Sequence, residues 1–192
     1  MSRDWQRLGA EALAHLRTLG EAGCKAAGPE EALRPITAFL PTFLGDHEAA
    51  NRSGALRPGE RQFFVCGCFM VSPDGTENWL IAENGFPPEQ HRLRIPMGLG
   101  HPGWVVAHGQ RLIIPNTDLN TEFKQILKTA RMGSALYAPL YRGGRLFGQL
   151  IAAAQARDTY QEGDLDILSA FAPLVSALFI SHGGEAWLKA LR

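Results

Sequence analysis

The sequence contains few of the residue types that would define a functional class by themselves. Its 192 residues include only three cysteines, and 19 Lys and Arg residues balance 19 Asp and Glu residues. An odd number of cysteines without regular spacing excludes a disulfide framework, and the absence of a basic surplus argues against nucleic-acid binding. We therefore expect no nucleic-acid partner and, given the cysteine usage, a cytoplasmic location.

No segment has the length or composition of a membrane anchor. The longest apolar stretch, about residues 171–180, is well short of the roughly 18–20 residues needed to cross a bilayer. The N-terminus begins with charged residues rather than with an apolar signal core. Hydrophobic residues make up 45% of the chain, which is enough for a sizeable core. We expect a globular protein that has no membrane partner.

Motifs for common enzyme chemistry are also missing. We find no P-loop, no Ser-His-Asp arrangement with a nucleophile elbow, and no paired carboxylates in a plausible cleft. Cys66 and Cys68 are two residues apart on a predicted strand, so both face one side of a sheet. They are either a redox pair, two metal ligands or small core residues, and we favour the core because a zinc site needs four ligands. Cys24 is interpreted as a packing residue, and no metal site is expected.

The hydrophobic pattern predicts an α+β fold. Two hairpins, each closed by a glycine-containing turn, indicate an antiparallel sheet of five to six strands, and the helices before and after them indicate that helices flank it. The expected helices span 4–26, 30–44, 104–108, 121–131 and 163–181, and the expected strands span 61–72, 76–83, 93–97, 111–115, 134–141 and 145–155. We divide the chain into an N-terminal helical extension and linker (1–60), one domain (61–181) and a short C-terminal tail (182–192).

Five short blocks resemble the GAF domain family. Each block is weak alone, but their order and spacing together are specific, and the match covers about residues 61–179. The blocks are residues 94–109, which read RIPMGLGHPGWVVAHG, 112–116 (LIIPN), 133–140 (GSALYAPL), 143–150 (GGRLFGQL) and 160–168 (YQEGDLDIL). This resemblance implies a GAF/PAS-like sheet around one small-molecule pocket, in a stand-alone sensory protein of the signal-transduction type.

The GAF family includes one clear enzyme class, the free methionine-(R)-sulfoxide reductases. Their chemistry requires a thiolate nucleophile with a resolving partner. The positions that match their cysteines here are Arg92, the His101-Pro102 pair and the cysteine-free stretch 116–130. We therefore expect a non-catalytic protein. A thiol-dependent enzyme related to these reductases, and an interaction or dimerisation module without a ligand, remain as alternatives.

We predict the ligand site between the sheet and the segments 98–108 and 121–131. The glycines at 98, 100 and 103 form a turn that leads to a helix N-terminus, and its N–H groups favour an anionic group. Pockets combine apolar walls with a few convergent polar groups. We therefore expect a small anionic or amphipathic metabolite, name no cofactor, and assign ligand contacts to Gly100, His101, Gly103, Trp104, Phe123, Ser134 and Tyr137.

The expected route of signal output is through other molecules. No kinase, cyclase or transcription domain is recognisable in the sequence, so a signal would leave through a signalling or transcription partner protein or through a change in a dimer. The apolar stripe on residues 5–19 and the apolar helix at 165–179 leave more apolar surface than one sheet face needs. We therefore expect a homodimer with a helical interface.

Overall fold

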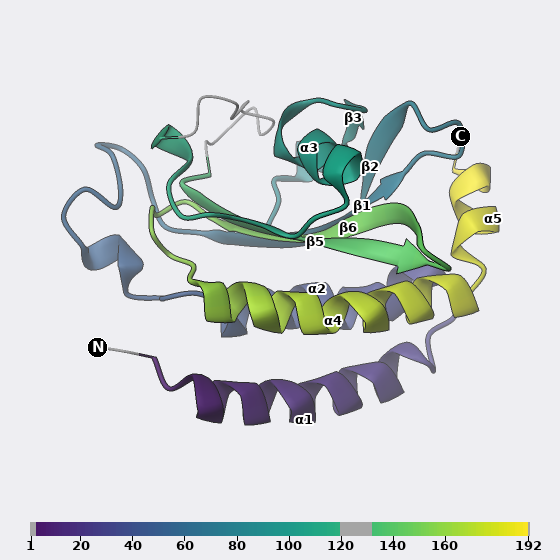
Figure 1. Cartoon of the computed structure of the whole chain (residues 1–192), viewed down its shortest axis with the longest axis horizontal. Coiled ribbons are helices and arrows are strands. Elements are labelled where there is room, and N and C mark those ends of the chain that lie inside the picture. The colour runs from purple at the N-terminus through teal and green to yellow at the C-terminus, as the bar shows by residue number, and fades with distance from the viewer. Residues whose placement is uncertain (1–2, 120–131, 192) are drawn as a thin grey trace.

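The computed structural model describes residues 3–119 and 132–191 and has four layers (Figure 1). Helix α1 (Trp5–Gly23) is outermost and covers a layer made of α2 (Pro29–Phe43) and α4 (Glu162–Ser181). The sheet lies beneath that layer, and α3 (Gly100–His108) lies on the opposite face of the sheet. The predicted α+β sandwich is therefore confirmed.

The sheet has six strands, and every neighbouring pair is antiparallel. Their order across the sheet is β3-β2-β1-β6-β5-β4. The long strands form the two predicted hairpins, and the short strands β3 and β4 are the edges. The bounds are β1 (Phe64–Val71), β2 (Glu77–Asn84), β3 (Arg94–Pro96), β4 (Leu112–Ile114), β5 (Ser134–Arg142) and β6 (Arg145–Ala154).

Strand alternation divides the apolar side chains into two clusters, one on each face of the sheet. The larger cluster lies between the sheet and the helices α2 and α4 and includes Cys66, Leu136, Leu150 and Phe171. The smaller cluster, hereafter the α3-face cluster, includes Phe69 and lies beneath α3, which packs on β5 and β6. Most of the sheet is therefore buried on both faces.

Contrary to the expectation that no segment has the length of a membrane anchor, helix α4 is long and apolar enough to cross a membrane, although 56% of its most apolar window is buried inside the fold. It packs on β5 and β6 and against α2 and α1. Burial of this kind is typical of the core helix of a globular protein. Asp164 in its first turn accepts hydrogen bonds from the backbone N–H groups of Gly45 and Gln161 and pairs with Arg3. It therefore links the start of α4 to the start of α1 and the end of α2.

Two local expectations are wrong. Helix α1 ends at Gly23 rather than at residue 26, and Cys24 at its C-terminal cap is exposed rather than packed. Helix α2, expected at 30–44, is one helix that runs through both of its internal prolines. The C-terminal tail contains a helix, α5 (Gly184–Ala190), because Gly183 adopts a left-handed conformation that ends α4 and starts a new direction. The expected helix 121–131 lies outside the described residues.

Candidate functional site at the α3 face

The turn before α3 is built by glycines that approach each other closely. The helix begins at Gly100 and not at residue 104 as predicted, because Pro102 needs no N–H partner in a first turn. A Cβ atom on Gly103 would lie 2.3 Å from the carbonyl carbon of Gly98, so only glycine fits there. The glycines therefore shape the turn, and Trp104 lies in the second turn of the helix rather than at its exposed N–H groups.

Two of the predicted contact residues meet between α3 and the sheet. The rings of His101 and Tyr137 are both buried and lie edge to face, with 6.0 Å between their centroids. Burial raises the pKa of Tyr137 well above its ordinary value, so its phenol stays uncharged at neutral pH. Trp104 is half-buried and packs against the α3-face cluster, and its ring stacks on that of His108 at 4.2 Å.

Two predicted contact residues are not in this group. Ser134 precedes Leu136 by two residues on β5 and pairs with Ala154, and both of these neighbours belong to the cluster on the α2 and α4 face. Strand alternation therefore directs the Ser134 side chain away from Tyr137 and α3. Phe123 lies outside the described residues.

Two buried carboxamides on the α3 face were not predicted. Gln149 lies in the centre of β6, is fully buried, and donates from Nε2 to the backbone oxygen of Pro102 at 3.0 Å. Asn78 on β2 is also fully buried, and its Nδ2 lies 3.5 Å from the sulfur of Met97. Neither carboxamide oxygen has a hydrogen-bond partner within residues 3–119 and 132–191. A polar residue at an inward position of an otherwise apolar strand was the signal that could have identified Gln149.

The three cysteines lie away from this face. Cys66 and Cys68 are fully buried in the cluster on the α2 and α4 side, which confirms the prediction that they are core residues. Burial raises the pKa of both thiols far above their ordinary value, and for Cys66 the neighbouring Cys68 raises it further. A thiol in this environment is a poor nucleophile. Cys24 is exposed, but it lies at the end of α1, on the far side of the helical layer.

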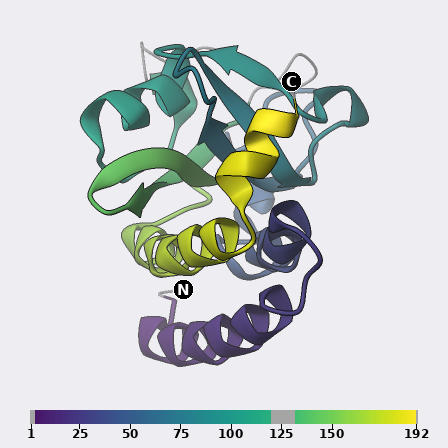
Figure 2. The same ribbon diagram turned by 90° about the vertical axis from the view of Figure 1, so that its right-hand side faces the viewer.

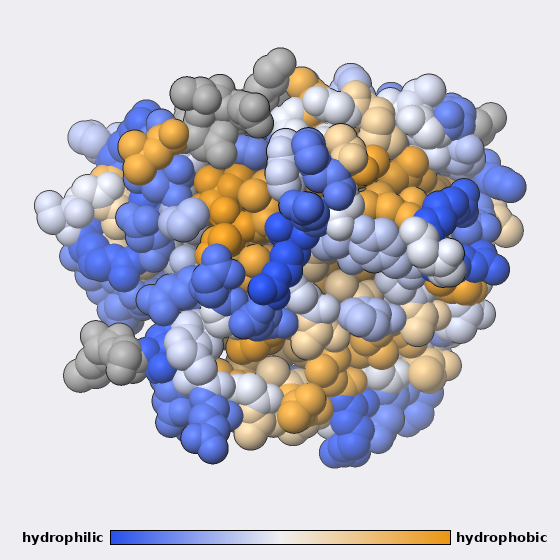
Figure 3. Space-filling model, in the orientation of Figure 1, coloured by the Kyte–Doolittle hydropathy of each residue, from blue (hydrophilic) through white to orange (hydrophobic). Residues whose placement is uncertain are grey.

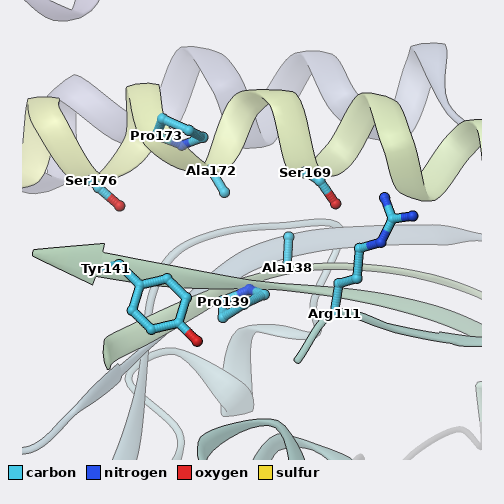
Figure 4. Close-up of a pocket in the computed structure, with 8 residues that line it drawn as sticks. All are labelled: Arg111, Ala138, Pro139, Tyr141, Ser169, Ala172, Pro173 and Ser176. Carbon is cyan, nitrogen blue, oxygen red and sulfur yellow. The ribbon is translucent and has the colours of Figure 1, made fainter. Parts of the chain in front are cut away.

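A hollow lies between β5 and α4, away from the α3 face. It is a groove of about 400 Å³ whose walls are mainly alanine, proline and serine, with Tyr141 and Arg111 at its two ends (Figure 4). Arg111 pairs with Asp166 on α4, and the Tyr141 hydroxyl donates to the backbone oxygen of Gly109. The groove therefore presents apolar surface between polar groups that already have partners. Nowhere in residues 3–119 and 132–191 do three or more His, Cys, Asp or Glu side chains gather as metal ligands would.

The comparisons with known proteins agree with this architecture. A family profile for the GAF domain matches residues 55–179, which is more than half of the chain. The chain therefore belongs to the GAF domain family. No curated protein sequence matches it.

Solved structures of the same fold come from proteins of different function. A free methionine-R-sulfoxide reductase from Neisseria meningitidis, solved with its substrate, is 20% identical and superimposes with a TM-score of 0.71 over 96% of this chain and 95% of that chain. The GAF domain of a phosphoenolpyruvate-protein phosphotransferase from Coxiella burnetii is 19% identical, with a TM-score of 0.72 over 92% and 96%. The reductase of Staphylococcus aureus in its reduced form is 16% identical, with a TM-score of 0.64 over 93% and 99%. At these identities the likeness establishes the fold alone.

Proposed function

We propose that the chain is a small-molecule-sensing regulatory GAF protein that binds a metabolite at the α3 face and releases it unchanged. The observation that carries this proposal is the set of buried polar groups on an otherwise apolar face. The phenol of Tyr137, the imidazole of His101 and the carboxamide of Gln149 all lie between the sheet and α3. Leaving a buried carbonyl oxygen unpaired costs about 1–3 kcal/mol, and a ligand with a hydrogen-bond donor would recover that cost.

The chemistry of the face favours an uncharged donor over an anion. Pro102 supplies no N–H group to the first turn of α3, which weakens the anion site expected from the sequence. The oxygens of Gln149 and Asn78, which have no partner among the described residues, are hydrogen-bond acceptors, and acceptors repel a carboxylate. We propose a flat or apolar molecule that carries an N–H or O–H group.

The placement of the cysteines supports a non-catalytic role over thiol chemistry. The neighbouring reductases make an enzyme a reasonable alternative, but a thiol enzyme needs an accessible thiolate at the substrate site. Cys66 and Cys68 are buried on the opposite face of the sheet, and Cys24 is at the end of α1. A ligand-free interaction module is the other alternative, and the test below separates it from a sensor.

The test combines mass spectrometry of molecules that co-purify with the native protein and thermal-shift screening of a metabolite library. We expect hits whose affinity falls at least about fivefold in Trp104→Ala and Tyr137→Phe, because a lost aromatic wall or a lost hydrogen bond costs about 1 kcal/mol or more. Ser134→Ala is the matched control, since Ser134 is buried on the same strand but faces the other way. The absence of any hit would favour the interaction module, and chemical conversion of a hit would identify an enzyme.

We also propose that the chain forms a homodimer through α1 and α4. A groove of about 360 Å³ runs between these helices and is lined by Trp5, Leu13, Leu16 and Ile167 among others. Leu13 is 68% exposed beside this groove, so its side chain extends the apolar surface that the groove begins. Figure 3 shows apolar surface gathered over α4 and over its seam with α1.

Light scattering tests this assembly. At tens of micromolar we expect the mass of a dimer for the natural sequence and the mass of a monomer for Leu13→Arg, because a buried unpaired charge disfavours the apolar interface. Leu119→Arg, which changes another highly exposed leucine away from these helices, is the control and should leave the dimer intact. A monomeric mass for the natural sequence contradicts the proposal.

A further inference from the structure

Helix α5 packs on a surface at one end of the sheet through few buried residues. It follows the end of α4 and lies across one end of the strands, in front of them in the view of Figure 2. Of its seven residues only Gly184 and Leu188 are buried, and Trp187 is half-buried. Isolated helices of this length are unstable in water, so α5 depends on its contacts with the surface beneath it. We call that surface the α5 seat.

The α5 seat carries more positive charge than α5 neutralises. Arg142 and Arg145 share the single carboxylate of Glu185, at 3.1 and 3.0 Å. At the other end Arg94 stacks on Trp79, 4.1 Å from the ring centroid, and donates to the backbone oxygen of Leu191 at 3.2 Å. In α5 itself one glutamate is balanced by one lysine, so three arginines of the seat face a helix without net charge.

Helix α5 also leaves space on both of its sides. On the hairpin side a cavity of about 190 Å³ is lined by Phe147 and Phe179 from the core and by Leu188 and Lys189 from α5. Arg145 lines the same cavity, so Lys189 brings a second positive charge to it. On the β3 side a cavity of about 90 Å³ is lined by Trp79, Ile81, Arg92, Arg94 and Leu191. Unfilled space of this kind forfeits packing energy that a better-fitting helix would gain.

We propose that the α5 seat is a docking surface for an acidic amphipathic helix of a partner protein, and that α5 occupies it as a placeholder. A partner helix with a large apolar residue at the place of Leu188 and acidic residues facing the arginines matches the seat in both shape and charge. This proposal goes beyond ligand sensing, because docking requires no metabolite at the α3 face.

Fluorescence anisotropy with a labelled peptide tests the proposal on the full chain. The peptide carries residues 183–191 with Lys189→Glu, which replaces the one positively charged side chain of that segment. We expect the Leu188→Ala protein to bind this peptide at least about tenfold more tightly than the natural protein does, since removing the buried anchor frees the seat. Leu119→Ala, the same substitution at an exposed position, should bind like the natural protein.

Charge reversal tests whether the arginines of the seat attract the peptide or whether the seat only supports α5. The double substitution Arg142→Glu, Arg145→Glu also loosens α5, because both new carboxylates repel Glu185. In the Leu188→Ala background this double substitution should nevertheless weaken peptide binding at least about tenfold. Glu185→Gln serves as a second releasing variant and leaves the buried core intact. Circular dichroism melts confirm that each variant is folded.

Several results would overturn the proposal. They are equal peptide affinity in the natural and Leu188→Ala proteins, no effect of charge reversal, and equal binding of a scrambled peptide of the same composition. Binding of the Leu188→Ala protein to phosphatidylserine vesicles but not to the peptide would assign the seat to lipid, and a dimer formed only on release of α5 would assign it to a second copy. None of these results depends on the metabolite screen, so each proposal can fail alone.

Discussion

A buried arginine should contribute far more to stability than an exposed one that binds the same carboxylate. Arg157 is the centre of an ion cluster, with 2% of its side chain exposed. Its Nε donates to Asp118 at 3.0 Å, its Nη2 donates to Glu60 at 3.1 Å, and its Nη1 also pairs with Glu60. Arg57 reaches the same Asp118 oxygen at 2.8 Å, but 57% of its side chain is exposed.

The two arginines therefore form a matched pair for substitution. Removing one partner of a buried ion pair costs about 3–5 kcal/mol, because the remaining charges lose their compensation. Exposed pairs are worth about 0–1 kcal/mol, because water and salt screen them. We expect Arg157→Met to lower the free energy of unfolding by about 3–5 kcal/mol and Arg57→Met to lower it by less than about 1 kcal/mol.

Low pH should remove the stabilisation that the Arg157 ion cluster contributes to the fold. Burial raises the pKa of the Glu60 carboxyl. Hydrogen bonds from Arg157 and from the Arg57 backbone N–H, together with the charge of Arg157, lower that pKa by more than burial raises it. The pKa of Glu60 therefore lies below its ordinary value of 4.5. A carboxyl whose pKa is lower in the folded state stabilises the fold above its unfolded pKa. That stabilisation is lost as the pH falls through the folded pKa.

Urea unfolding at several pH values measures both effects. The natural protein should lose stability below about pH 4.5, and Arg157→Met should lose less over the same range, because its Glu60 pKa is closer to that of the unfolded chain. The Arg57→Met protein should follow the natural pH profile. Equal losses for the two substitutions at neutral pH, or the same acid profile in Arg157→Met as in the natural protein, would refute the reasoning.

Two further predictions concern packing. Gly103→Ala should lower the free energy of unfolding by about 2–3 kcal/mol, because the new Cβ atom collides with backbone that cannot move aside. Gly9→Ala should raise the free energy of unfolding by about 0.5–1 kcal/mol, because there is open space around Gly9 in α1. Chemical denaturation measures both changes. A thiol reagent should add one label per folded chain, at Cys24, and three after unfolding, as counted by mass spectrometry. Rapid labelling of Cys66 or Cys68 in the folded protein would show that the core interpretation is wrong.

The hairpins were predictable because their signals are local. Alternating apolar residues and the glycines of each turn lie next to each other in the sequence, and the predicted strands match β1, β2, β5 and β6 within a few residues. The start of α3 was missed for the opposite reason. Gly100 and Pro102 look like turn residues in sequence, and only the packing against Gln149 and the sheet shows that they begin a helix.

The candidate site was predictable only in part. Ser134 and Tyr137 are three residues apart on one strand, so alternation alone directs them to opposite faces, and the sequence already contained that information. The Arg157 cluster is different, because its partners Glu60 and Asp118 lie 97 and 39 residues away along the chain. No local pattern reports such a pairing, and only the folded topology brings these charges together.

The short strand β3 connects the two proposed surfaces. Ile95 lies in the α3-face cluster, whereas its neighbour Arg94 points to the other side, stacks on Trp79 and holds the end of α5. The turn that leads to α3 follows β3 directly, so a ligand that moves this turn displaces Arg94 through only a few peptide bonds. Binding linkage is reciprocal. If β3 carries a signal, a metabolite bound at the α3 face changes the affinity of the α5 seat for an acidic helix. The acidic helix, when bound, then changes the affinity for the metabolite by the same factor.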